Sequence, residues 1–303
     1  MDDAKRKAFV VLGVGLLAIS WAAILVRLCH APAMIVAFYR LALSAIILAP
    51  WFFLSGTSDY APRWRRGWGL MVLSGVFLAS HFHCWIEAVQ RAPVALAVTI
   101  SSTHPVFVGI LSQLVYGKGF GRARAVGTLV TVGAVAGMMW DPSSWSHGDL
   151  YGFLWALGAS FFFALYMMIG QRVRTRTGII SYVVPVYGVA AFVLMAGAIF
   201  RGLDFLGYSP QTIAMFILLA LVPTVIGHSS LNWALGHLSA TMVAVSVLAE
   251  PVGASLLAWA ILGERLRGSV IFWGSIILFG IYISSREEIW ERGSRRGRVH
   301  EGI

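Results

Sequence analysis

The chain has 303 residues, of which 58% are hydrophobic and 12% are charged, and its mean hydropathy is +0.79. Because about a quarter of the residues in soluble domains are charged, this composition excludes a soluble globular protein. A formal net charge of +10 would suggest a nucleic-acid partner for a soluble chain. Here the Lys and Arg residues lie in short segments between apolar runs, where they determine membrane orientation. We therefore expect the lipid bilayer, and no nucleic acid, as the partner.

Ten apolar runs follow one another, and each is long enough to cross a bilayer as a helix of roughly 20 residues. They lie near 8–28, 33–54, 67–88, 94–115, 125–140, 150–170, 180–200, 211–232, 240–262 and 269–285. The first run is longer than the core of about 7–15 residues of a secretory signal, so we interpret it as a retained helix. The sequence predicts an all-α integral membrane protein with ten transmembrane helices.

Lys and Arg side chains are concentrated in every second connection between the spans, and this pattern predicts the orientation of the spans. If the N-terminus is cytoplasmic, five lie outside: Arg27, Arg91, Arg201, Arg265 and Arg267. Apart from Arg40 in the second span, the other 17 of the 23 Lys and Arg residues lie inside. We expect both termini in the cytoplasm and a multi-pass protein of a bacterial-type inner membrane. Nine or eleven spans stay open, because the inner connection at 236–239 carries neither Lys nor Arg.

The two halves of the chain show a weak internal repeat. Residues 88–117 align with 234–263, and the alignment brings Pro105 onto Pro251 and Gly117 onto Gly263. A chance alignment of two apolar helices is the alternative, but the surrounding loop lengths also agree. Because five spans separate the copies, the second half enters the membrane inverted, as in many secondary transporters. We predict repeats at 1–143 and 144–288, followed by a basic cytoplasmic tail at 289–303.

Short motifs accompany this repeat. They are Phe38-Tyr39-Arg40 in the second span, the run around Pro105, and Glu250-Pro251 followed by Gly263-Glu264 in the ninth. Together with the span pattern, they resemble the drug/metabolite transporter superfamily, in particular its EamA-type members with two five-helix repeats. The chain departs from the pattern at Gly117-Lys118, where the first repeat would commonly end in Gly-Glu.

Within that superfamily the sequence is similar to the YddG group of amino-acid exporters, which is associated with aromatic amino acids. The resemblance implies export of small metabolites, most plausibly amino acids including aromatic ones, by alternating access through a central cavity. Members share the architecture while moving different solutes, so the fold does not fix the substrate. A same-fold exchanger of phosphorylated sugars or nucleotide-sugars is the alternative, and it would need several cavity cations.

Ionisable side chains inside spans are functional candidates, because they are costly in a bilayer unless paired or hydrated. They are Arg40, His81, His83, Glu87, His104, His228 and Glu250. Arg40 is interpreted either as an anchor for a substrate carboxylate or as a structural group bonded to helix carbonyls or to Glu87. The second interpretation is favoured, because an Arg in a family motif need not contact substrate.

Aromatic residues suggest a cavity wall. His81 and Trp85, four residues apart, share one helix face, and Trp155 and Tyr166, eleven apart, share another. We predict that these four side chains line one central cavity that binds an amphipathic solute. Interhelical packing and interfacial aromatics are the alternative.

His104 and Glu250 occupy matching repeat positions, each directly before a proline that can kink its helix and free a backbone carbonyl. The functional interpretation is a gate or substrate contact, with Ser101 and Ser246 one turn away as further candidates. The alternative is that Glu250 braces backbone freed at a kink.

Enzymatic chemistry finds little support in the sequence. There is no phosphate-binding loop for ATP and no zinc-protease motif, and Cys29 and Cys84 show no spacing typical of a metal or disulfide site. A membrane-embedded enzyme acting on lipid would group its His and carboxylate residues near one headgroup level, whereas the histidines are scattered over several spans. We expect no cofactor and no metal; the oligomeric state is open, and a monomer is plausible.

Overall fold

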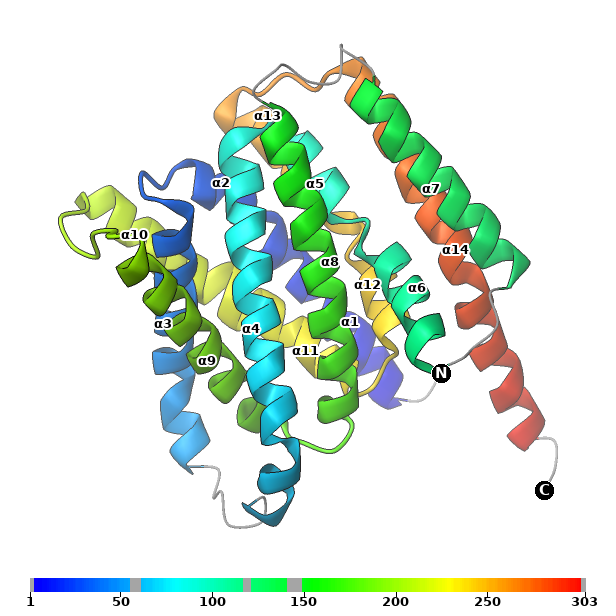
Figure 1. Ribbon diagram of the computed structural model, residues 1–303. Coiled ribbons are helices and arrows are strands. Elements are labelled where there is room, and N and C mark those ends of the chain that lie inside the picture. Colours follow the sequence, from blue (N-terminus) through cyan, green and yellow to red (C-terminus); the bar gives the residue numbers. More distant parts are fainter. Residues whose placement is uncertain (1–2, 55–60, 117–120, 141–148, 301–303) are drawn as a thin grey trace.

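The computed structural model describes the backbone of residues 3–54, 61–116, 121–140 and 149–300, and this part of the chain is helical throughout apart from short connections (Figure 1). The first half holds α1 (Asp3–Ser20), α2 (Ala22–Arg27), α3 (Ala33–Leu54), α4 (Ala61–Arg91), α5 (Val94–Ser101), α6 (His104–Tyr116) and α7 (Arg122–Trp140). The second half holds α8 (Asp149–Arg174), α9 (Ile179–Phe200), α10 (Pro210–Leu219), the π-helix η2 (Ala220–His228), α11 (Ser229–Leu235), α12 (Ala240–Ser246), α13 (Ala249–Leu262) and α14 (Gly268–His300).

The helices of the described residues form ten crossings, in agreement with the sequence prediction. Eight stretches are long and apolar enough to span a bilayer, and two shorter apolar helices, Ala125–Met138 and Gly268–Ser284, supply the fifth and tenth crossings. Several crossings are interrupted: α1 and α2 form the first, α5 and α6 the fourth, and α12 and α13 the ninth. The protein is therefore an all-α, multi-pass membrane protein.

The interruptions follow the internal repeat. The break between α5 and α6 falls at Ser102 and Thr103, and the break between α12 and α13 falls at Val247 and Leu248, so the breaks agree to within one residue when the two halves are aligned. Packing repeats as well, since α4 lies against α8 while α1 lies against η2 and α11. This symmetry is that of two inverted five-helix repeats. The predicted boundary at residues 143 and 144 lies outside the described residues.

Local sequence explains several helix ends. Ser209 caps α10 by accepting a hydrogen bond from the N–H of Thr212, with Pro210 in the first helical position, and Ser239 caps α12 in the same way. Gly263 ends α13 with a φ of 66°, the left-handed conformation that glycine adopts at low cost. At the C-terminal end, α14 continues as a helix to His300, into the segment predicted as a basic tail.

The pair α7 and α14 lies at one edge of the bundle in Figure 1. A Cβ atom at Gly280 would collide with the carbonyl of Gly127 and with Thr131, and one at Gly127 would collide with the backbone of α14. Small residues at a crossing let two membrane helices approach closely. This pair therefore packs backbone to backbone and leaves the interior of the bundle to the other eight crossings.

Candidate functional site

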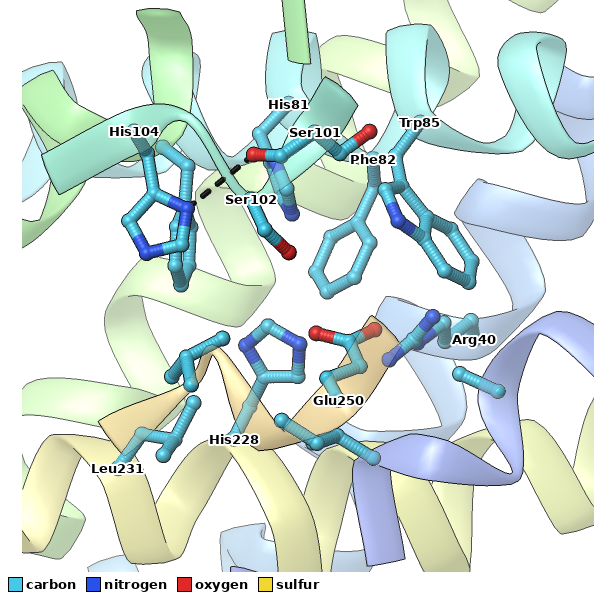
Figure 2. A pocket seen from close by; sticks show the side chains of 14 residues that line it. Arg40, His81, Phe82, Trp85, Ser101, Ser102, His104, His228, Leu231 and Glu250 are labelled. Atoms are coloured by element: carbon cyan, nitrogen blue, oxygen red, sulfur yellow. Dashed lines mark hydrogen bonds between the residues drawn. The ribbon is translucent and has the colours of Figure 1, made fainter. Parts of the chain in front are cut away.

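A polar cavity lies in the interior between the two repeats (Figure 2). Its lining residues come from both halves of the chain and are Ile19, Ala22, Arg40, His81, Phe82, Trp85, Ser101, Ser102, His104, Phe163, His228, Leu231, Val247 and Glu250. The centre of a water molecule can occupy about 20 Å³ of it, which is room for about one water. In this conformation the space is narrow, and a larger solute enters only when lining side chains separate.

The two broken crossings deliver much of the polar lining. The end of α5 and the start of α6 bring Ser101, Ser102 and His104 to the cavity, and the start of α13 brings Glu250 from the other repeat. Broken helices near the membrane midplane are typical of transporter binding sites, because irregular backbone is tolerated where it lines a cavity. The Ser101 hydroxyl is buried without a hydrogen-bond partner, so this wall presents an open polar group.

Arg40 is buried, with 1% of its surface exposed. Its Nε donates to the hydroxyl of Thr224 at 2.7 Å, and its guanidinium carbon lies 4.1 Å from the centre of the Phe82 ring. The two terminal nitrogens, Nη1 and Nη2, have no hydrogen-bond partner. The suggested pairing of Arg40 with Glu87 is wrong, because Glu87 bonds Arg91 on its own helix at 2.7 Å.

The π-helix η2 positions two residues at the site. Thr224, which holds Arg40, donates its own hydroxyl proton to the carbonyl of Leu219, five residues earlier. At the end of η2, His228 lines the cavity with a buried Nδ1 that has no partner. π-Helical turns are rare in proteins, and those that do occur are often found at functional sites. The sequence showed His228 as an ionisable residue in a span but gave no sign of the π-helix.

Imidazole and phenyl rings form the remaining wall. The Nδ1 of His81 donates to the carbonyl of Ala159 at 2.9 Å, since a carbonyl only accepts, and its ring stacks on Phe163 with centroids 4.6 Å apart. His104 meets the same ring edge-on at 4.8 Å. Sequence reasoning missed Phe82 and Phe163, because uncharged aromatic residues are common throughout membrane helices.

The structure brings most of the candidate residues to this one cavity: Arg40, His81, Trp85, Ser101, His104 and Glu250. The prediction that Trp155 and Tyr166 also line it is wrong for this conformation. Trp155 packs against His83 with ring centroids 5.3 Å apart, and the hydroxyl of Tyr166 donates to the side chain of Asn232 at 2.8 Å. Ser246 lies outside the lining as well, because its hydroxyl bonds the carbonyl of Met242 one turn back.

The described residues contain no cluster of three His, Cys, Asp or Glu side chains arranged to hold a metal ion. The cavity nevertheless carries one cation and one carboxylate: Arg40 from the first repeat and Glu250 from the second. They attract each other electrostatically but form no ion pair, since both terminal nitrogens of Arg40 lack a partner. Chemically, the site offers opposite charges, hydroxyls, imidazoles and aromatic surface around one narrow cavity.

Comparison with known proteins identifies the family. The sequence matches the EamA-like transporter family twice, over residues 7–140 and 150–286. The chain belongs to this family. Its two matched segments coincide with the two five-helix repeats, so the drug/metabolite transporter fold suggested by the sequence is confirmed.

Several curated relatives of this transporter are named as exporters of amino acids or of amino-acid metabolites. It is 25% identical to a "Probable amino-acid metabolite efflux pump" of Salmonella typhimurium, over 88% of this chain and 90% of the relative. It is 27% identical to the "Threonine/homoserine exporter RhtA" of Escherichia coli K12, over 75% and 73%. A solved crystal structure superposes with a TM-score of 0.68 at 16% identity, over 92% of this chain and 97% of the other, which supports the fold.

Proposed function

We propose that this EamA-like transporter exports amino acids from the cytoplasm by alternating access, as an uncoupled facilitator or a secondary transporter. The observation that carries the proposal is the narrow polar cavity between the repeats, which is lined both by Arg40, with two unpartnered nitrogens, and by Glu250. The relatives named for threonine, homoserine and amino-acid metabolites support the substrate class. Residues 1–143 and 144–288 are the two units that rock about this site.

The lining suggests which amino acids to test first. Ser101, Ser102 and His228 offer hydrogen bonds to a hydroxylated side chain, as in threonine or homoserine, and Phe82 and Trp85 offer surface to an aromatic one. Exchange of sugar phosphates is disfavoured, because a phosphate dianion needs several cations, whereas Arg40 is the sole Lys or Arg among the lining residues and Glu250 would repel the anion.

Transport by purified protein in liposomes tests the proposal. Uptake of each amino acid is scanned with and without a pH gradient, which also separates proton coupling from facilitation. We expect uptake of threonine or homoserine above that of protein-free liposomes. Absence of transport for every amino acid would refute the proposed substrate class.

The positive-inside distribution supports an orientation with both termini in the cytoplasm. Single cysteines placed at residues 175–178, in the connection predicted at 171–179, are then unreactive toward an impermeant thiol reagent in intact cells and reactive in inverted vesicles. Efficient labelling of this connection from outside would contradict the orientation.

A further inference from the structure

The geometry points to Arg40 and Glu250 as a two-point site for a zwitterion, in which the guanidinium binds the α-carboxylate of an amino acid and Glu250 binds its α-ammonium. This inference rests on the proposed transport of amino acids and specifies how the cavity recognises them. It requires both charged ends of the substrate, so it separates α-amino acids from simple acids and from simple amines.

Arg40 is prepared for a carboxylate. Thr224 fixes its Nε and the Phe82 ring lies under its plane, so the guanidinium is held from two sides while its terminal nitrogens remain open. A planar guanidinium presents such nitrogens in a fork that matches the two oxygens of a carboxylate. A structural brace would use these donors on protein carbonyls, and in this structure both lack a partner.

The unused donors are costly where they lie. A buried donor without a partner loses its hydration without compensation, and the loss is larger for a charged group in a membrane. The cavity is therefore less stable when it holds no anion. A carboxylate ligand supplies the hydrogen-bond acceptors that the protein does not provide for the terminal nitrogens of Arg40.

Glu250 adds recognition of the substrate's ammonium group to the recognition of its carboxylate by Arg40. It projects from the start of α13 toward the same space, and Figure 2 shows its carboxylate in the region between His228 and Arg40. An acid without an ammonium group satisfies Arg40 but confronts the charge of Glu250, and an amine without a carboxylate leaves the Arg40 donors open. A zwitterion satisfies both groups and adds no net charge to the membrane interior.

The two residues also belong to different repeats, since Arg40 lies on α3 and Glu250 on α13. A ligand bonded to both therefore links the two units that move in alternating access. Without the ligand, Arg40 and Glu250 are not bonded to each other, so the link depends on the substrate. Substrate binding on both residues thereby favours this arrangement of the cavity over arrangements that move Arg40 and Glu250 apart.

Competition in liposomes tests the two-point site with threonine as the probe. Counterflow of labelled L-threonine is inhibited with unlabelled L-threonine, with N-acetyl-L-threonine, which lacks the ammonium, and with L-threonine methyl ester, which lacks the carboxylate. Because each blocked end loses a charge-assisted hydrogen bond, we expect both analogues to inhibit roughly tenfold less well. If N-acetyl-L-threonine inhibits as well as L-threonine, Glu250 does not bind the ammonium and the inference is overturned.

Variants assign each end of the substrate to its residue. In Glu250→Gln, the disadvantage of the N-acetyl analogue relative to threonine disappears while that of the ester remains. In Arg40→Gln the pattern reverses. A merely structural role would weaken inhibition by all three compounds equally. An unchanged ratio of inhibition between threonine and its analogues in a folded variant therefore contradicts the assignment.

Glu87→Gln and Arg91→Gln are matched controls, because they remove the same charges from a pair that lies outside the cavity lining. We expect both controls to keep the wild-type order of inhibition. The wild-type comparison stands even where a cavity variant fails to fold. If the protein moves no amino acid at all, the proposed function itself falls. If threonine is transported but both blocked analogues inhibit as well as L-threonine does, the two-point site alone is overturned.

Discussion

Glu264, just after α13, forms an ion pair with Arg27 at the end of α2, with a nitrogen–oxygen distance of 3.2 Å. The same carboxylate accepts a hydrogen bond from the backbone N–H of Val94 at 2.9 Å, and Arg27 also donates to the carbonyl of Ala92 at 2.6 Å. Arg27, Ala92 and Val94 belong to the first repeat, and Glu264 belongs to the second. These contacts therefore join the two repeats at one end of the bundle.

Removing this link is expected to open that end more often. The ion-pair side chains are 27% and 24% exposed, so the ion pair contributes about 1 kcal/mol or less, and Glu264→Gln shifts the opening equilibrium by at most roughly fivefold. The measurement is the rate at which an impermeant thiol reagent labels Ser102→Cys in the cavity from that side. Glu87→Gln is the control, because its ion pair lies within α4 and joins no repeats. Equal labelling rates in the two variants would contradict the link.

Burial of the two native cysteines limits the background in the Ser102→Cys labelling experiment. Cys29 and Cys84 are both buried. Burial raises the pKa of the Cys29 thiol to about 12, so this thiol stays protonated and unreactive near neutral pH. We expect the wild-type protein to label slowly at neutral pH, which leaves the introduced cysteine as the main reporter.

Thr224 is expected to act by positioning Arg40. Thr224→Val keeps the shape of the side chain but removes the acceptor of the Arg40 Nε, and a hydrogen bond to a charged group contributes about 1.5–3 kcal/mol. Threonine transport should fall roughly tenfold or more, with the larger effect on apparent affinity. Thr224→Ser retains the hydroxyl and should restore most of the affinity. If Val and Ser transport alike, the hydroxyl does not position the guanidinium.

The sequence predicted most of the fold, because bilayer-length apolar runs and two aligned prolines are visible without a structure. The breaks appear where His104-Pro105 and Glu250-Pro251 had indicated kinks. The π-helix was not predictable, because an extra residue in the turn at Ala220–His228 breaks the 3.6-residue periodicity on which helix faces are judged. The contact between Thr224 and Arg40 depends on that turn, so it escaped prediction too.

Sequence identified those site residues whose type is unusual for an apolar span. Arg40 and Glu250 stand out as charges in apolar spans, and both line the cavity. Spacing was less reliable: Trp155 and Tyr166 were placed together by helical periodicity, which gives a shared face but not the neighbour that this face meets. Tyr166 bonds Asn232 instead. Which face looks into the bundle is decided by tertiary packing.

Trp85 is expected to influence substrate choice. It is 5% exposed, lines the cavity and lies 5.8 Å from the Arg40 guanidinium. Trp85→Ala should weaken transport of aromatic amino acids roughly three- to tenfold, because an aromatic contact contributes about 0.5–1.5 kcal/mol beyond burial, and should affect threonine less. Uptake of phenylalanine and threonine in liposomes measures both. A folded variant that moves the two equally well would show that Trp85 is a packing residue.

Glu250 is expected to confer part of the pH dependence of transport. Only its ionised carboxylate attracts an ammonium group strongly, so acidification should weaken substrate binding in the wild type. Glu250→Gln should transport less at neutral pH and show a flatter acid limb, with Arg40, His81, His104 and His228 as the other charged or titratable lining groups. The measurement is threonine counterflow from pH 5 to 8. An unaltered pH profile would make Glu250 a structural brace.

The most direct test of the account is reversible obstruction of the cavity between the repeats. Threonine counterflow by Ser102→Cys is measured before modification with a bulky methanethiosulfonate reagent, after it, and after the adduct is removed with a reductant, with labelling stoichiometry and the wild type as controls. Because Ser102 lines the cavity, we predict that transport is lost on modification, is recovered on reduction, and is protected by excess threonine. Undiminished threonine transport through the fully modified protein would contradict the account.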